Sequence, residues 1–222
     1  MLKKGLIWIL GICMMACSIQ PQQTEEKRIR ILCYGDSNTY GFDPFSGRYP
    51  KKKRWTSLLQ NQLPGNVQVI NEGRNGRTTA YDLFDDPSLN GASTLPDTLK
   101  KHPDCDLIIF MLGTNDCSLV RDADQIRQGM EQLLEIAQKE YPKPKQILLV
   151  TPAAIQSESP PGILSRQIAP YYQALAQKYS ALYFDGTDAF ELCEDGIHLS
   201  ETGHRQVADA LAECIKQSPI FS

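Results

Sequence analysis

The chain has 222 residues, of which 41% are hydrophobic and 22% charged, and its formal net charge is −3. This composition is ordinary for a globular protein, and the length suits a single domain with a substantial core. The negative net charge gives no electrostatic case for binding nucleic acid, so we expect no such partner. The basic run KKKR at Lys51–Arg54 leads into a helical pattern, and we interpret it as the solvated start of a helix.

The N-terminal segment has the build of an export signal. Lysines precede an apolar stretch over residues 5–15, which is too short to cross a bilayer as a stable helix. The stretch ends in MMAC, which resembles the lipobox of a bacterial lipoprotein, whose cysteine is acylated. We expect residues 1–17 to be a signal peptide with lipid on Cys17, and residues 18–28 to be a polar tether. This predicts an exported cell-envelope lipoprotein, periplasmic or anchored in an outer membrane; plain secretion is the alternative if Cys17 is not acylated.

Strand and helix patterns alternate over residues 29–217. Branched and aromatic residues predict strands at residues 29–34, 67–71, 106–112, 146–151 and 181–185. Apolar residues at helical spacing predict helices at residues 54–63, 122–140, 165–180 and 200–217. Pro170 is expected to kink the third of these helices or delay its start. Five strands separated by helices indicate an α/β domain with a mainly parallel sheet covered on both faces.

The cysteines give no indication of a metal site. Beyond the predicted signal peptide the chain retains Cys33, Cys105, Cys117, Cys193 and Cys214, without a CxxC pair or a His-rich spacing. We therefore expect no metal and no other cofactor. Because the number is odd, at least one thiol is free, and Cys33 in a predicted buried strand is the natural candidate.

Polar motifs follow four of the five predicted strands. They are GDSN (35–38), NEGRNGRTT (71–79), GTND (113–116) and DGIH (195–198). The carboxyl ends of parallel strands share one edge of the sheet, and ligands bind outside that edge in folds of this class. The four motifs therefore predict a single site.

Ser37 is the candidate nucleophile of that site, and it needs a base and an orienting group. His102 precedes the third strand, at the wrong edge of the sheet, and His204 lies in the last helix, where we expect a surface role. His198 follows Asp195 by three residues, so the carboxylate can fix one imidazole nitrogen and leave the other for Ser37. The alternative for DGIH is a glycine turn into a capped helix, with an exposed histidine.

Three donors are candidates for holding the oxyanion of an acyl-transfer intermediate. They are the backbone N–H of Ser37, the backbone N–H of Gly76 and the side-chain amide of Asn115. Taken singly, Gly76 could be a turn glycine and Asn115 an Asx-turn residue. Their shared position beside Ser37 favours the catalytic interpretation.

Together these blocks resemble those of the SGNH, or GDSL, hydrolases, in the same order and at similar spacing. The resemblance covers about residues 29–216, and through residues 54–63, 70–102 and 106–117 it extends to the arylesterase and acyltransferase branch. It implies a three-layer flavodoxin-like fold and the hydrolysis of short-chain acyl esters through an acyl-serine, without a metal. Acyl transfer to another acceptor is a further activity of that branch.

The substrate is left open by the sequence. The segment at residues 152–163 is shorter than the covering insertion of that branch, which leaves the acyl pocket and any homo-oligomer undecided. Exported SGNH enzymes also include carbohydrate O-acetylesterases, for which Asn75, Arg77, Trp55 and Asp116 are candidate cleft residues; structural roles are the alternative. A lysophospholipase would need an extended apolar lid, which is not visible. A module that binds an ester or glycan without turnover is the hypothesis of another class.

Overall fold

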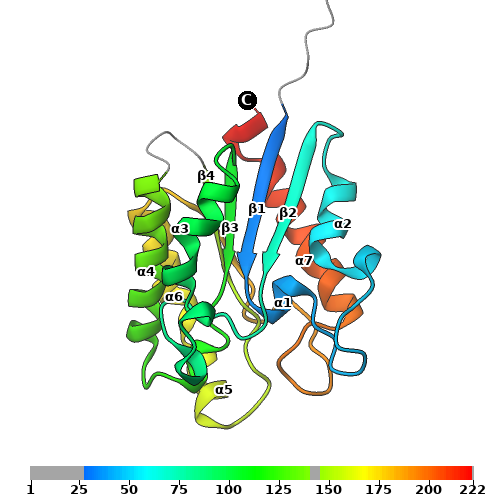
Figure 1. The fold of residues 1–222 in the computed structure, drawn as a ribbon. Helices are drawn as coiled ribbons and strands as arrows, with labels where there is room; N and C mark the ends of the chain where they lie inside the picture. The colour runs from blue at the N-terminus through cyan, green and yellow to red at the C-terminus, as the bar shows by residue number, and fades with distance from the viewer. Residues whose placement is uncertain (1–27, 141–145, 222) are drawn as a thin grey trace, which may run out of the picture.

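The computed structural model describes residues 28–140 and 146–221. Its five strands form one parallel sheet in the order β2-β1-β3-β4-β5 (Figure 1). They are β1 (Ile29–Gly35), β2 (Val67–Gly73), β3 (Leu107–Met111), β4 (Gln146–Thr151) and β5 (Leu182–Asp185). All five strand predictions are confirmed to within a residue or two at each end. The predicted signal peptide, Cys17 and the tether before residue 28 lie outside the described residues.

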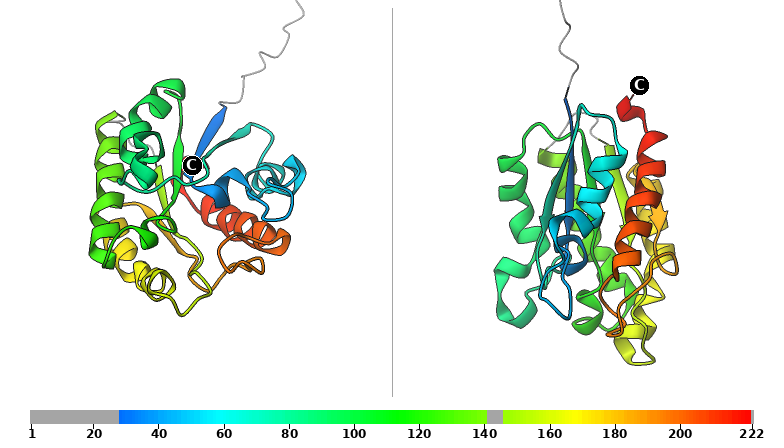
Figure 2. Two further views of the ribbon diagram at one scale, coloured as in Figure 1. Left: turned by 60° about the horizontal axis from the view of Figure 1, so that its bottom comes forward. Right: turned by 90° about the vertical axis from the view of Figure 1, so that its right-hand side faces the viewer.

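Helices cover both faces of the sheet, which makes the three layers visible in Figure 2. On one face lie α2 (Trp55–Gln62) and α7 (Glu201–Lys216), and on the other α3 (Gly91–Lys101), α4 (Ala123–Glu140) and α6 (Ile168–Lys178). Two short helices, α1 (Ser37–Tyr40) and α5 (Pro160–Ser165), lie beyond the carboxyl ends of β1 and β4. The strand order is that of flavodoxin-like folds, so the predicted fold class is confirmed.

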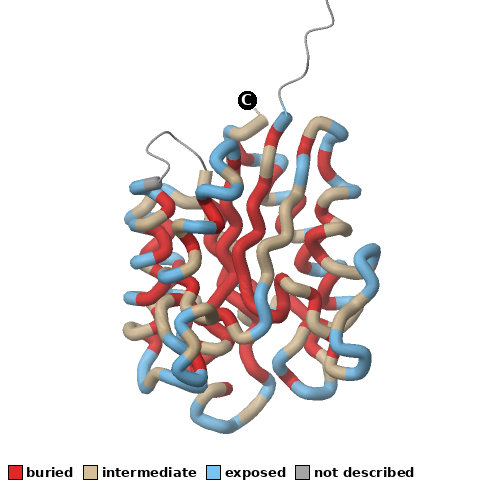
Figure 3. The backbone as a smooth tube through the Cα atoms, viewed as in Figure 1, coloured by how far each residue is buried: buried red, intermediate tan, exposed pale blue. Residues whose placement is uncertain are grey.

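The alternation of side chains along β1 shows how the sheet separates two cores. Leu32 and Tyr34 belong to the cluster under α3, α4 and α6, whereas Ile31 and Cys33 belong to the cluster under α2 and α7. The central strands are buried on both faces, as the red tube in Figure 3 shows. Cys33 is a free, fully buried thiol, as expected, and its burial raises its pKa well above the usual value.

One predicted helix begins later than expected, and one helix was not predicted. The helix expected at residues 165–180 is α6, which begins only at Ile168, two residues before Pro170, whereas α5 ends at Ser165. Proline is tolerated in the first turn of a helix, where backbone N–H groups lack intrahelical acceptors, so it delays the start without kinking the helix. The helix α3 was not predicted at all, and Asn90 caps it by accepting a hydrogen bond from the N–H of Ser93.

The contact between α2 and α7 overturns two expectations. His204 has no exposed surface, and its Nδ1 accepts a hydrogen bond from the N–H of Trp55 at 3.3 Å. His204 therefore satisfies a donor at the start of α2. The Trp55 side chain is also fully buried, in the core that α2 and α7 share. The predicted surface role of His204 and the predicted substrate contact of Trp55 are both wrong, because each side chain is enclosed where the two helices pack.

The burial of His204 predicts a pH dependence of stability. Burial, with a smaller contribution from the nearby positive charge of Arg54, lowers the pKa of His204 to about 4. Between the ordinary value of about 6.5 and this value, the unfolded chain binds a proton on His204 that the folded protein does not. Its contribution to the free energy of unfolding is therefore complete above pH 6.5 and is lost as the pH falls toward 4, at up to about 1.4 kcal/mol per pH unit.

Replacing His204 with asparagine is expected to flatten this dependence, because the amide oxygen can still accept from the N–H of Trp55 but does not titrate in this range. Urea unfolding of both proteins at several pH values between 7 and 4.5 measures the difference. Parallel curves of unfolding free energy against pH would contradict the assignment, whatever the absolute stability of the variant.

The two ends of the sheet have different roles. The described chain enters β1 at its amino end, the top of Figure 1, whereas GDSN and the loops that follow the other strands lie at the opposite, carboxyl edge. Within residues 28–140 and 146–221, no helix combines the length and the apolar character needed to cross a membrane.

Candidate active site

The candidate residues gather at the carboxyl edge, beside the boundary between β1 and β3. Ser37 begins α1 just after β1, and Asn115 lies just after β3. The chain leaves these two neighbouring strands toward opposite sides of the sheet, and in folds of this class ligands bind outside the carboxyl ends of the strands at such a reversal. His198, which precedes α7, reaches the same place and contacts Ser37.

Three side chains form a continuous chain of hydrogen bonds there. Nε2 of His198 lies 3.1 Å from Oγ of Ser37, and Nδ1 of His198 lies 2.6 Å from Oδ2 of Asp195. Because an ionised carboxylate can only accept, Nδ1 carries the proton and the lone pair of Nε2 faces the serine hydroxyl. The structure thus brings together the serine, histidine and aspartate named from the sequence, in the arrangement required of a nucleophile, a base and its orienting group.

The surroundings of Asp195 keep it ionised. Partial burial raises its pKa, but hydrogen bonds from the N–H of His198, from the imidazole and from the N–H of Ile197 outweigh burial, and the pKa is lowered. A carboxylate held in this way remains negative through the neutral range, so it can stabilise an imidazolium on His198.

The GDSN turn places Ser37 at the start of a helix. Asp36 caps α1, since its Oδ1 accepts the N–H of Asn38 at 2.9 Å. Only glycine fits at position 35, where a Cβ atom would lie 2.1 Å from Oγ1 of Thr39. The chain can therefore turn directly from the strand into α1 and leave the Ser37 hydroxyl facing His198. Burial raises the pKa of Asp36 to about 6.

Asn38 has a role that the sequence analysis did not recognise. Its Oδ1 accepts the N–H of Leu199 at 2.8 Å, and its Nδ2 donates to the carbonyl of Ile197 at 3.3 Å. The residue next to the nucleophile therefore fixes the backbone on both sides of His198. Phe42 adds a second contact, with its ring 4.5 Å from the imidazole. The signal in the sequence is the amide directly after the serine, but its partners lie far along the chain.

Replacing Asn38 with alanine is expected to reduce kcat by up to about 100-fold with a small change in KM, because a displacement of about 1 Å between reacting groups can cost that much. The rate of p-nitrophenyl acetate hydrolysis under saturating conditions measures it. Asn61→Ala, at an exposed position of α2, is the matched control. An Asn38→Ala enzyme that stays folded and keeps its full kcat would contradict the positioning role.

The oxyanion donors named from the sequence lie on three neighbouring segments. As the first residue of α1, Ser37 has an N–H that the helix cannot satisfy. Gly76 has a φ of +76°, a left-handed conformation that strains any other residue. Nδ2 of Asn115 donates to the carbonyl of Arg77 at 2.9 Å. One amide hydrogen thus ties Asn115 to the loop that carries Gly76, and the other is available to a substrate.

Replacing Asn115 with alanine is expected to lower kcat by about 100- to 1000-fold, the usual effect of removing one oxyanion donor. The loss should fall on kcat and leave KM nearly unchanged, because the negative charge develops only in the transition state. Steady-state kinetics with p-nitrophenyl acetate separate the two constants. A loss confined to KM would instead assign Asn115 to ground-state binding.

The other proposed cleft residues have structural positions. Asp116 has no exposed surface, its two oxygens accept the N–H of Thr79 at 3.0 and 3.1 Å, and burial raises its pKa to about 6. Arg77 is buried with its guanidinium 4.0 Å from the centre of the Tyr34 ring. Its Nη1 donates to the carbonyl of Gly35 at 2.9 Å. Asp116 and Arg77 therefore brace the loops instead of lining a cleft, and these two predictions are wrong.

Asn75 is the exception among the proposed cleft residues, because it is exposed. It directly precedes Gly76, in the loop that follows β2. This position leaves Asn75 accessible to a ligand beside the oxyanion donors, so its contact with substrate stays a proposal.

Comparison with protein families gives a match over most of the domain. The family model described as the GDSL-like Lipase/Acylhydrolase family matches residues 33–206. Among solved structures, the native aryl esterase of M. smegmatis is 34% identical, with a TM-score of 0.79, and the match covers 85% of this chain and 98% of that one.

Two curated relatives are more distant. The acetylxylan esterase of Xylanibacter ruminicola is 27% identical over 218 residues, which cover 86% of this chain and 44% of that protein. The Bacillus subtilis protein named "Uncharacterized lipoprotein YqeF" is 27% identical over 120 residues, covering 51% of this chain and 45% of its own length. The chain therefore spans less than half the length of either curated relative.

Proposed function

Because the chain belongs to the GDSL-like lipase/acylhydrolase family and is a carboxylic ester hydrolase, we propose that it cleaves short-chain acyl esters through an acyl-serine on Ser37. The observation that carries the proposal is the unbroken line of hydrogen bonds from Ser37 through His198 to Asp195. A serine hydroxyl is a weak nucleophile until an adjacent base accepts its proton.

In the first half of the reaction, Oγ of Ser37 attacks the carbonyl carbon of the ester while Nε2 of His198 takes the hydroxyl proton. The N–H groups of Ser37 and Gly76 and the Asn115 amide stabilise the resulting oxyanion, and the Asp195 carboxylate stabilises the imidazolium. Collapse of the tetrahedral intermediate breaks the bond to the leaving oxygen. That oxygen takes the proton from His198 and departs as an alcohol.

The second half of the reaction releases the acyl group. A water molecule gives its proton to Nε2 of His198 and attacks the acyl-serine. As the tetrahedral intermediate collapses and the carboxylic acid leaves, His198 returns the proton to Oγ of Ser37. An alcohol in place of water would give acyl transfer by the same steps. The acceptor therefore decides between hydrolysis and transfer.

Covalent labelling tests the mechanism directly. We expect the protein to hydrolyse p-nitrophenyl acetate and to lose this activity on reaction with one equivalent of a p-nitrophenyl phosphonate, with the added mass on the peptide that contains Ser37. Label on another residue, or a folded protein without hydrolysis, would overturn the serine-esterase proposal. The absence of hydrolysis would favour the binding-module alternative.

A carbohydrate O-acetylesterase is the second candidate function. It is favoured by the similarity to the acetylxylan esterase, which extends over 86% of this chain. In this case the acyl group is acetate and the leaving alcohol is a sugar hydroxyl, with the same chemistry at Ser37. Acetate release from acetylated xylan, compared with hydrolysis of aryl esters of increasing acyl length, distinguishes the two substrate classes.

We also propose that the protein is exported and carries lipid on Cys17. The MMAC sequence and the similarity to the B. subtilis lipoprotein support this location. Mass spectrometry of the mature N-terminus from native membranes should find diacylglyceryl cysteine at position 17. A mature N-terminus without lipid would contradict the anchor and favour plain secretion.

A further inference from the structure

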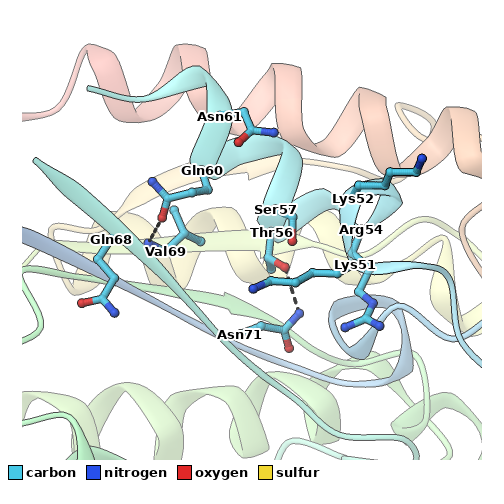
Figure 4. Close-up of a pocket in the computed structure, with 10 residues that line it drawn as sticks. All are labelled: Lys51, Lys52, Arg54, Thr56, Ser57, Gln60, Asn61, Gln68, Val69 and Asn71. Atoms are coloured by element: carbon cyan, nitrogen blue, oxygen red, sulfur yellow. Dashed lines mark hydrogen bonds between the residues drawn. The ribbon is translucent and has the colours of Figure 1, made fainter. Parts of the chain in front are cut away.

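A polar groove lies between α2 and the edge strand β2 (Figure 4), and Ser37, Asp195 and His198 are not among its lining residues. Its lining combines cationic, amide and hydroxyl side chains with a single apolar residue: Lys51, Lys52, Arg54, Thr56, Ser57, Gln60, Asn61, Gln68, Val69 and Asn71. Three of these residues are cations, and none carries a carboxylate. The groove is thus locally positive in a chain whose net charge is −3.

The cations of the groove lack internal counterions. Lys51 and Lys52 are exposed, and no carboxylate among residues 28–140 and 146–221 lies within 4 Å of either ammonium group. Their neighbour Lys53, by contrast, pairs with Glu201. Burial and the like charge of Arg48 lower the pKa of Arg54. An anionic ligand would relieve this concentration of positive charge.

The floor of the groove does not offer a free strand edge. The Gln60 side chain reaches from α2 to β2, where its Oε1 accepts the N–H of Val69 at 2.8 Å and its Nε2 donates to the carbonyl of Val67 at 2.9 Å. These bonds occupy backbone groups that an added peptide strand would need. The exposed side chains of Asn61 and Gln68 remain available to hydrogen-bond a ligand.

The chemistry of the lining selects among anionic partners. Single-stranded nucleic acid is held by stacking on aromatic side chains, and the groove has none. An inserted membrane-surface site needs an apolar face, whereas Val69 is the only apolar lining residue, and an electrostatic lipid site uses about four to eight cations, whereas this lining has three. We propose that this groove binds an acidic polysaccharide, with sugar carboxylates on Lys51, Lys52 and Arg54 and sugar hydroxyls on the amide side chains.

One end of the groove adjoins the helix that carries the nucleophile. Nδ2 of Asn71 donates to the carbonyl of Thr39 at 2.6 Å, and the Arg54 side chain packs against Gly41 at the carboxyl end of α1. Ser37 lies at the other end of α1, about 6 Å away along a helix of this length. A polymer held in the groove would therefore lie close to the helix that carries Ser37. Any effect of that polymer on catalysis rests on the proposed function, but binding to the groove does not.

The experiment compares the wild type with the double variant Lys51→Gln/Lys52→Gln and with a matched control. Lys100→Gln/Lys101→Gln removes two adjacent exposed lysines from α3 instead. Binding to polygalacturonate is measured by affinity electrophoresis and titration calorimetry, with neutral dextran, a single-stranded oligonucleotide and anionic phospholipid vesicles as comparison probes. Hydrolysis of p-nitrophenyl acetate, which is too small to need the groove, is measured on all three proteins. A failure of the proposed function or of the fold can then be told apart from a loss of binding to the groove.

We expect wild type and control to bind polygalacturonate in a salt-sensitive manner and not dextran. The groove variant should bind polygalacturonate about five- to tenfold more weakly, because it loses two exposed ion pairs with the ligand. Its hydrolysis of p-nitrophenyl acetate should be unchanged. Equal loss in both double variants, or no binding of polygalacturonate by wild type, would overturn the proposal. Tighter binding of the oligonucleotide or the vesicles would overturn it in favour of that class of partner.

Discussion

Replacing Ser37 with alanine is expected to reduce kcat for p-nitrophenyl acetate by a factor of about 10⁴ to 10⁶, with little change in KM. The reason is the loss of the bond-forming oxygen, which neither the oxyanion donors nor His198 can replace. What remains would come from the oxyanion donors and from substrate binding. Single-turnover measurements at high enzyme concentration can quantify such a low rate.

The interpretation of that result requires an intact fold. The Ser37 hydroxyl makes one side-chain hydrogen bond, to Nε2 of His198, so the melting temperature of the variant should stay within a few degrees of the wild type. Ser93→Ala, at an exposed position of α3, is the matched control and should keep full activity. Equal activity in Ser37→Ala and wild type would end the serine-esterase proposal.

The Asp195→Asn variant is expected to lose about 10³- to 10⁴-fold in kcat, through orientation and charge rather than through a missing reactant. The amide has no negative charge to stabilise the imidazolium, and its NH₂ group can donate to Nδ1 of His198. The imidazole would then carry its proton on Nε2, where it can no longer accept from Ser37. Because the Asp195 side chain is 29% exposed, water can partly replace its carboxylate, which favours the lower end of this range.

A pH profile of kcat/KM distinguishes this effect from a damaged loop. Asp195→Asn should lose activity at every pH at which the wild type is active, because the pKa of Asp195 is lowered and its carboxylate is charged throughout. Glu194→Gln alters the adjacent exposed carboxylate and should behave as wild type. If both variants lost activity equally, the loop and not the orientation of His198 would be the cause.

The strands and the layered fold could be predicted because their signals are local. Each strand of the sheet is a short run of branched and aromatic residues. A run that is apolar along its length predicts a strand buried on both faces without reference to distant parts of the chain. The helix α3 was missed since it begins at Gly91 and contains Pro96, residues that disfavour a helix interior by propensity. Its stability comes from the Asn90 cap and from packing of Leu95 and Leu99, which only the tertiary structure supplies.

The residues of the candidate site likewise divide into those with a local signal in the sequence and those whose role depends on the tertiary structure. Ser37, His198 and Asp195 could be named because their chemistry is rare in combination and their motifs follow strand ends. Trp55 and Asp116 were misassigned because the sequence does not show which face of a helix or loop turns inward. The bridge that Asn38 makes to Ile197 and Leu199 spans most of the domain, so no local pattern could reveal it.

The amino end of β1 and the carboxyl edge of the sheet lie at opposite ends of the domain, which limits how far Ser37 would lie from an anchor on Cys17. Residues 18–28 have a maximum extended length of about 40 Å, and they join the domain at Ile29. The length of β1 adds about 23 Å between that attachment and the carboxyl edge. With lipid on Cys17, Ser37 would therefore act on substrates within roughly 60 Å of the bilayer surface.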